Sequence, residues 1–256
     1  MPKQKGTHRL LGTTGDMTYQ KTQDGYTARE KTHINGDKIR TSDAYARTRE
    51  NMAEFGRSGK ASKLLRAALS KLIKNGADTR MTSRLTGTFS RIIKTDPVND
   101  RGQRVVTEGN ILLLEAFDFN INAALITTFA TPVSSTINRT TGVCTVNISA
   151  VILSEIVTAP EGTTHLRIVT GAAELDFERE HYISAFSASS DLPVSNVETP
   201  ALTLTAQVTA QSQLPLFLVM GVQFIQVVNG KVYPLKNGAF NPLTIVKIDA
   251  PLSEEI

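Results

Sequence analysis

The most regular hydrophobic pattern in this chain lies in residues 60–74. Apolar side chains recur there at the three- and four-residue spacing of one helix face. They are Leu64, Leu65, Ala68, Leu69, Leu72 and Ile73. Gly76 follows the stripe, and glycine commonly lies just past the end of a helix. The pattern therefore predicts an amphipathic helix from about Lys60 to Lys74 with one buried face.

Two further helices are predicted on either side of this one. The first begins at Ser42 or Asp43 as its cap and runs until Gly56 stops it. Its apolar face is predicted to hold Ala44, Thr48, Met52 and Phe55. The other starts after Thr79 and stops at Asp96, because a proline follows. Its apolar residues are Met81, Leu85, Phe89, Ile92 and Ile93.

From residue 105 onward the pattern changes to short apolar or alternating runs between turn residues. The predicted strands are Val105–Thr107, Ile111–Phe119, Ala123–Phe129, Val143–Ser149, His165–Thr170, Ala172–Phe177, Tyr182–Ala185, Ala201–Thr209, Leu216–Val228, Lys231–Pro234 and Leu243–Ile248. The strongest hairpin signal is Asn229-Gly230 between the ninth and tenth of these runs. No helical pattern separates the strands, so a parallel α/β sheet is not expected. We predict an α+β protein whose C-terminal part is an antiparallel β-sandwich, Ig-like or jelly-roll-like.

The first forty residues are poor in large apolar side chains and rich in glycine and Asn/Asp turn residues. Strand-like pieces at 17–20 and 26–29, with turn dipeptides at Asp24-Gly25 and Asn35-Gly36, indicate one or two hairpins. A hairpin alone is marginal in water. Residues 1–40 are therefore predicted to be an extended arm that rests on another surface. The other predicted domains are a basic helical region at 41–104 and the β-sandwich at 105–256.

Charge is divided unequally between the two parts of the chain. Residues 1–104 hold 22 of the 28 Lys and Arg and 10 of the 24 Asp and Glu, a net charge of +12. Residues 105–256 hold the remaining 6 and 14, a net charge of −8. This division indicates a partner for the basic part, either nucleic acid or the acidic part of another copy.

Three groups of residues are candidates for contacts with such a partner. The arm would use Tyr19, Tyr26 and Arg29. The basic interface would use Arg47, Arg49, Lys60, Lys63, Arg66, Lys71 and Lys74. The acidic interface would use Glu174, Asp176, Glu178 and Glu180, whose alternate spacing places them on one face of a strand. The same acidic row is also compatible with a solvated sheet edge, or with a calcium site or a pair of carboxylates for hydrolysis.

Motifs that would indicate an enzyme are missing from the sequence. The single cysteine, Cys144, excludes an intramolecular disulfide and a Cys-based zinc site, and we expect it to be buried. The histidines His8, His33, His165 and His181 show no metal-binding spacing. The glycines at 12 and 15 are not followed by the Gly-Lys-Ser/Thr of a phosphate loop, and no GxSxG is present. We therefore predict a non-enzymatic protein with no cofactor and no metal.

The N-terminal sequence carries no apolar run long enough for a secretory signal, and no stretch is long enough to span a membrane. The chain is expected to be synthesised in the cytoplasm without a cleaved signal. An extracellular or particle-associated location after release remains compatible with this expectation.

Residues 11–66 carry two dense blocks of motifs. The first is Leu11-Gly12-Thr13-x-Gly15, then Tyr19-x-Lys21, then Asp24-Gly25-Tyr26-x-Ala28-Arg29-x-Lys31. The second is Arg47-Thr48-Arg49-Glu50-Asn51-x-x-Glu54-Phe55-Gly56, then Gly59-Lys60-x-x-Lys63-Leu64-Leu65-Arg66, with Arg101-Gly102-Gln103-Arg104 further on. These blocks resemble an uncharacterised family from Bacteroidetes genomes that has no assigned activity. The resemblance implies a bacterial or phage-linked source and transfers no catalytic residue.

Three functions are compatible with these observations. The first is a structural subunit that assembles head-to-tail with other copies of itself into a filament, tube or shell, through its arm and its charge-complementary surfaces. The second is a nucleic-acid-binding packaging or virion coat protein, because the basic helices could neutralise phosphates. The third is a ligand-binding β-sandwich module, which the scarcity of Trp and Tyr disfavours for sugars.

Overall fold

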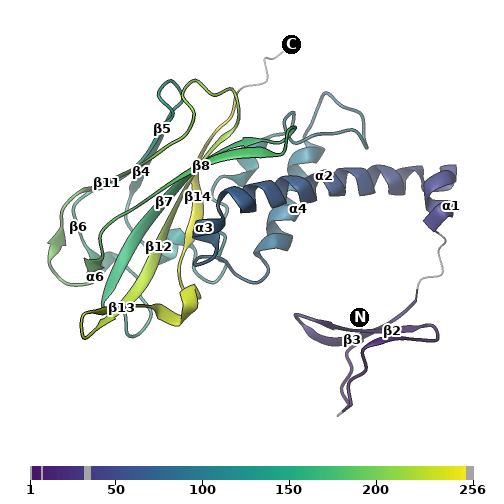
Figure 1. Cartoon of the computed structure of the whole chain (residues 1–256), viewed down its shortest axis with the longest axis horizontal. Helices are drawn as coiled ribbons and strands as arrows, with labels where there is room; N and C mark the ends of the chain where they lie inside the picture. The colour runs from purple at the N-terminus through teal and green to yellow at the C-terminus, as the bar shows by residue number, and fades with distance from the viewer. Residues whose placement is uncertain (1, 7, 32–35, 252–256) are drawn as a thin grey trace. The chain divides into compact units, whose positions relative to one another are not determined.

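The computed structural model describes residues 2–6, 8–31 and 36–251 (Figure 1). It forms two compact units, Met1–Glu50 and Asn51–Ile256. The structure is α+β, with a small N-terminal sheet, helices, and C-terminal antiparallel sheets that include a curled half-barrel. The domain boundaries at residues 40 and 104 stay predictions.

The first unit contains a three-stranded antiparallel sheet in place of one or two isolated hairpins. Its strands are β1 (Gly12–Thr14), β2 (Met17–Thr22) and β3 (Gly25–Glu30), in the order β1-β2-β3. The β2–β3 turn lies at residues 23–24, one position earlier than predicted, because Thr22 pairs with Gly25. The helix α1 (Gly36–Thr41) and the 3-10 turn η1 (Asp43–Tyr45) follow. Asn35 of the other predicted turn lies outside the described residues.

This first unit has no hydrophobic core among its described residues. Every buried apolar side chain of the described chain lies at Ala61 or later, and the buried side chain within the first fifty residues is that of Thr27. Leu10 is 54% exposed and Leu11 is 65% exposed. The sheet is therefore held mainly by its backbone hydrogen bonds, which contribute little net stability in water.

The second unit contains the main helices and all remaining strands. Its helical elements are α2 (Ala46–Ala68, from residue 51 onward in this unit), α3 (Ser70–Ile73), α4 (Met81–Lys94), η2 (Ile111–Leu114), α5 (Leu125–Thr128), α6 (Leu153–Ile156) and η3 (Leu235–Gly238). Its strands are β4 (Val133–Asn138), β5 (Val143–Ile148), β6 (Val151–Ile152), β7 (His165–Asp176), β8 (His181–Ala188), β9 (Leu192–Pro193), β10 (Glu198–Thr199), β11 (Leu202–Gln207), β12 (Leu216–Val228), β13 (Lys231–Pro234) and β14 (Leu243–Asp249).

The strands pair antiparallel in one large sheet and two smaller ones. The main sheet has the order β13-β12-β7-β8, with β14 also pairing with β12 and β9 with β7. A second sheet has the order β11-β5-β4, and β10 pairs with β6. The β12–β13 turn is the predicted Asn-Gly hairpin, because Asn229 and Gly230 have positive φ angles of 50° and 74°.

The central strands of the main sheet, β7 and β12, are buried on both faces because their side chains alternate between two cores. Phe217 and Val219 of β12 pack with the apolar faces of α2, α3 and α4. Leu216, Leu218 and Met220 of the same strand pack with residues of β5 and β11. Figure 1 shows this arrangement, with helices on one side of β7 and β12 and the smaller sheet on the other.

The predicted helical stripes and the bounds of the third helix, α4, are confirmed, but the predicted boundary between the first two helices is wrong. Leu64, Leu65, Leu69 and Leu72 are buried, as are the five apolar residues predicted for α4. Gly56 does not stop a helix: α2 runs through it, and the chain breaks at Leu69 before α3 instead. The apolar face predicted for the first helix is not buried, because Met52 is 61% exposed and Phe55 is 63% exposed.

Several predicted strands are also wrong. Val105–Thr107 is an irregular segment, Ile111–Phe119 begins with the 3-10 turn η2, and Ala123–Phe129 contains the short helix α5. The predicted break at Gly171 does not exist, because β7 continues through it. A Cβ atom at Gly171 would lie 2.9 Å from Leu72 Cδ1, so this glycine lets α3 pack closely on the sheet.

Candidate functional site

The segment 95–112 passes from the end of α4 to η2 and is fixed by a buried carboxylate. Asp96 is only 4% exposed and accepts hydrogen bonds from the backbone N–H groups of Val98, Asn99 and Val105. The Asn99 side chain donates a fourth. Burial alone would raise the pKa of Asp96, but these hydrogen bonds favour the charged form and lower it below its ordinary value.

Replacing Asp96 with Ala should destabilise the protein by about 2–4 kcal/mol, because it leaves buried N–H groups without an acceptor. The pKa of Asp96 is lower in the folded state than in the unfolded state, where it is about 3.9. The charged carboxylate therefore stabilises the folded protein at pH values above about 3.9, and this stabilisation is lost as the pH falls through the folded-state pKa. Urea unfolding at pH 7 and pH 3 should therefore show a smaller pH dependence for Asp96→Ala than for wild type. Asp96→Asn keeps one acceptor oxygen, so its stability at pH 7 should lie between those of wild type and Asp96→Ala. Its side chain does not titrate, so its pH dependence should match that of Asp96→Ala. Equal pH dependence in all three would contradict this role.

A second carboxylate fixes the same segment to α2. Glu54 is buried and accepts a hydrogen bond from Gly102 N at 2.8 Å. Arg57 donates to the carbonyl oxygens of Gly102 and Arg104, at 2.8 and 3.2 Å. Arg101 donates to the side chain of Asn51. The second motif block and the Arg-Gly-Gln-Arg motif, which are far apart in the sequence, therefore contact each other, and the contact positions the segment that follows.

The turn after β7 lies beside the helix. Asp176 accepts hydrogen bonds from Glu178 N and Arg179 N, at 3.0 and 2.9 Å. Lys60 of α2 reaches Glu180 at 2.7 Å. The hydrogen bond and positive charge of Lys60, with a further contribution from Lys63, lower the pKa of Glu180 below its ordinary value. Basic and acidic residues predicted to meet between copies thus meet within one chain at this point.

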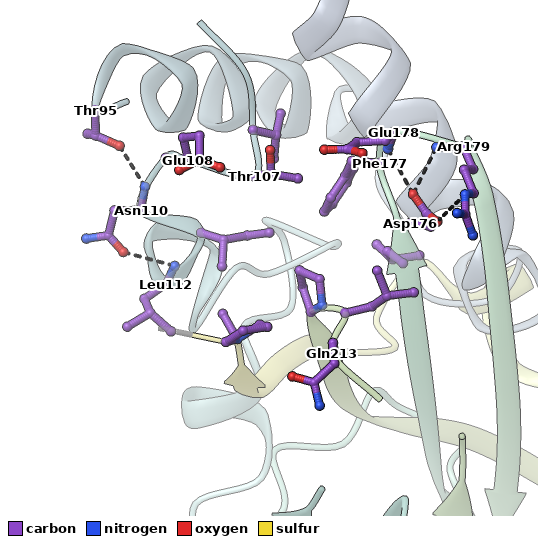
Figure 2. Close-up of a pocket in the computed structure, with 18 of the residues that line it drawn as sticks. Thr95, Thr107, Glu108, Asn110, Leu112, Asp176, Phe177, Glu178, Arg179 and Gln213 are labelled. Atoms are coloured by element: carbon purple, nitrogen blue, oxygen red, sulfur yellow. Dashed lines mark hydrogen bonds and ion pairs between the residues drawn. The ribbon is translucent and has the colours of Figure 1, made fainter. Parts of the chain in front are cut away.

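These elements enclose an open cleft of about 700 Å³. Figure 2 shows residues 95–112 on one side of it, the β7 turn from Asp176 to Arg179 on the other, and Gln213 between them. Its floor is apolar and includes Val106, Ile111 and Leu175, which are all buried. Its charged lining residues are Glu108, Asp176, Glu178 and Arg179. The cleft therefore combines an apolar floor with a rim that carries a net negative charge.

The predicted acidic row does not lie on one exposed strand face. Glu174 is buried and accepts hydrogen bonds from Thr209 N and from the hydroxyl of Ser212. Asp176 ends the strand, while Glu178 and Glu180 lie in the turn region, where Glu180 has a positive φ of 52°. The alternate spacing puts these residues on one face only while the chain stays extended, and the chain turns after Asp176. Only its last three members reach the surface of the cleft or the turn.

The predicted basic residues are also divided among different environments. In the first unit, Arg47 pairs with Glu50, and Arg49 donates to the carbonyl oxygens of Ile39 and Ser42. In the second, Lys71 lies over the ring of Phe186 at 5.2 Å, and the Nε of Arg66 is buried without a hydrogen-bond partner. Among the five predicted basic residues of the second unit, Lys60 and Lys71 are therefore engaged with residues of the same chain, Arg66 is partly buried, and Lys63 and Lys74 are exposed.

The arm residues belong to the small sheet. Tyr19 and Tyr26 lie on β2 and β3 and are half-buried, whereas Arg29 is exposed. The guanidinium of Arg9 lies 4.8 Å from the centre of the Tyr26 ring, and the Lys21 ammonium lies 5.7 Å from it. These cation–π contacts hold the N-terminal segment against β3.

The sequence did not predict the cleft, because its lining comes from four segments that are distant in the chain, within residues 95–112, 175–179, 213–215 and 250–251. The local sequence signal for one part of it was Asn110, whose side chain accepts a hydrogen bond from Leu112 N and caps η2.

Cys144 is buried as expected, and burial together with the charge of Asp249 raises its thiol pKa to about 11. Over the described ranges, no cluster of three or more His, Cys, Asp or Glu could hold a metal ion, and no helix is long and apolar enough to cross a membrane.

No protein-family model, curated protein or solved structure matches this chain. The resemblance of the two motif blocks to a Bacteroidetes family stays a prediction.

Proposed function

We propose that this protein is a structural subunit that assembles head-to-tail, with the first unit of one copy resting on the second unit of another. The observation that carries the proposal is the lack of a hydrophobic core in the small sheet. None of its described apolar side chains is buried, although it is a compact unit with its own strand pairing. Such a sheet is marginal in water without a further apolar surface to pack on.

The second unit needs no such help for its own folding. Both hydrophobic clusters consist of residues from Ala61 onward, and they bury the central strands β7 and β12 of the main sheet on both faces. It nevertheless exposes large apolar side chains at separate positions, such as Phe55 and Ile126. A contact between the sheet of one copy and the second unit of the next does not close on itself unless a ring forms, so it generates a filament, tube or shell.

The test is the size of the intact protein in solution. Light scattering after size-exclusion chromatography, with negative-stain microscopy of the same fractions, should show species larger than the 27.8 kDa chain whose proportion rises with protein concentration. Charged groups contribute to the proposed contact and salt screens them, so the protein concentration at which half of the chains are assembled should rise as salt is added. A single 27.8 kDa species at every concentration and at low salt would refute the proposal.

The finer fold assignment also belongs with the proposal. The facing apolar sides of the main sheet and the β11-β5-β4 sheet support an Ig-like or jelly-roll-like β-sandwich for the C-terminal part. An experimental structure would test it through the connections between strands.

Nucleic-acid binding is the second candidate, because Lys63, Lys74, Arg91 and Lys94 of the helical layer are exposed. Fluorescence anisotropy with a labelled oligonucleotide should then show an affinity that falls steeply with salt. Binding that is absent at low salt would remove this candidate and leave the assembly proposal intact.

A further inference from the structure

We propose that the cleft beside the β7 turn receives the N-terminal segment of a second copy, with Leu10 and Leu11 on its apolar floor. This inference rests on the assembly proposed above and names the two surfaces that meet. The cleft volume of about 700 Å³ is within the range of about 300–1,000 Å³ in which proteins hold small ligands and side-chain anchors.

The inserted segment is presented in a defined conformation. Gln4 accepts a hydrogen bond from Leu10 N at 2.9 Å and donates to Leu10 O at 3.2 Å. Arg9 is held over Tyr26. Leu10 and Leu11 are the most exposed large apolar side chains among the described residues of the first unit. Because the segment is already ordered, docking it costs less conformational entropy than docking a free tail.

Charge favours this pairing of surfaces. The sequence before Asp16 contains Lys3, Lys5 and Arg9 and no acidic residue. The cleft is lined by three carboxylates and one guanidinium. The C-terminal residues of the same chain, which follow Pro251 at the cleft, carry Glu254 and Glu255, so their charge has the same sign as the rim. A basic, apolar segment from another copy is the occupant that fits both the floor and the rim.

Disulfide trapping between two copies tests the contact directly. Leu11→Cys is placed in a copy with an added affinity tag and Gln213→Cys in an untagged copy, and the two full-length chains are mixed at an assembling concentration under mild oxidation. Cys144 stays in place, because its burial and raised pKa leave the thiol unreactive in the folded protein. The matched control pairs Leu11→Cys with Ser154→Cys, an exposed position that does not line the cleft.

The expected result is a tagged–untagged dimer that forms at least about tenfold faster with Gln213→Cys than with Ser154→Cys, because proximity raises the effective concentration of the two thiols. A charge exchange gives a second readout. Lys5→Glu and Glu178→Arg should each raise the concentration at the assembly midpoint about tenfold, and the double variant should return to within about threefold of wild type. Lys5 is exposed, so this exchange leaves the contact of Arg9 with Tyr26 in place, and Lys5→Arg should resemble wild type.

The outcomes separate this inference from the proposal on which it rests. Assembly without preferential trapping at Gln213 and without rescue by the charge exchange would overturn the cleft as the acceptor and leave assembly standing. A chain carrying both Leu11→Cys and Gln213→Cys that closes only within itself, at a rate independent of dilution, would show that the segment occupies its own cleft. Absence of any assembly would end both.

Discussion

Replacing Leu69 with Asp should unfold the second unit under native conditions. Leu69 is fully buried in the cluster shared by the helices and the main sheet. Truncating a buried leucine costs about 2–5 kcal/mol, and an unpaired charge at the same place adds to this. The total of more than about 4 kcal/mol is comparable with the whole stability of an ordinary domain, which is about 5–15 kcal/mol.

Urea unfolding followed by far-UV circular dichroism measures this loss. Ser70→Asp is the matched control, because it introduces the same charge one position later at an exposed residue and should change the stability by less than about 0.5 kcal/mol. Leu69→Met keeps the volume and should cost less than about 1.5 kcal/mol. A stable Leu69→Asp protein with wild-type spectra would mean that the helices do not share a core with the sheet.

The burial of Leu69 was predictable from the sequence, because the spacing of the apolar residues around it is that of one face of a helix. The same spacing located α4 from Met81 to Ile93. The continuation of α2 through Gly56 was not predictable in this way. Glu54 and Arg57, on either side of that glycine, are fixed by backbone groups of residues 102–104, and this long-range contact outweighs the cost of about 1 kcal/mol for glycine in a helix.

Short apolar runs were the other source of error. The run Ile111–Leu114 has too few residues to show a period of either 2 or 3.6, so a strand and a turn of helix cannot be distinguished by pattern alone. The long apolar run of β12 has the predicted bounds, and so does β13, because the Asn229-Gly230 turn fixes where one strand ends and the other begins. The strand break predicted at Gly171 is wrong because this glycine does not end a strand. Its missing side chain leaves room for Leu72 to pack on the sheet.

The candidate site was predictable only in its parts. The charge division identified basic and acidic partners, and Lys60 and Glu180 do form an ion pair, but within one chain. The cleft depends on where four distant segments of the chain meet, and no local pattern determines that. What the sequence did indicate is that the first forty residues cannot form a core, and the exposure of Leu10 and Leu11 agrees with this.

Removal of residues 1–40 should abolish assembly and leave the second unit folded. The deletion takes away the three-stranded sheet and leaves every residue of both hydrophobic clusters in place. The free energy of unfolding of the second unit should therefore change by less than about 0.5 kcal/mol. Light scattering should give one species of the truncated chain's mass at concentrations where the intact protein is assembled.

A full-length variant tests whether the apolar contact itself is needed, because it keeps residues 1–40 and changes only the side chains proposed to dock. Leu10→Ser with Leu11→Ser removes the exposed apolar surface of the first unit and should raise the assembly midpoint at least about tenfold, because burying a leucine side chain is worth about 1.5–3 kcal/mol. Ile126→Ser with Val197→Ser is the matched control, since these side chains are 82% and 69% exposed and lie outside the cleft. If the truncated chain or the Leu10/Leu11 variant builds the same particles as wild type, contacts between copies are made by the second unit alone. The exposed faces of α2 and α5 would then be the surfaces to test, because they leave the large apolar side chains of Met52, Phe55 and Ile126 in solvent.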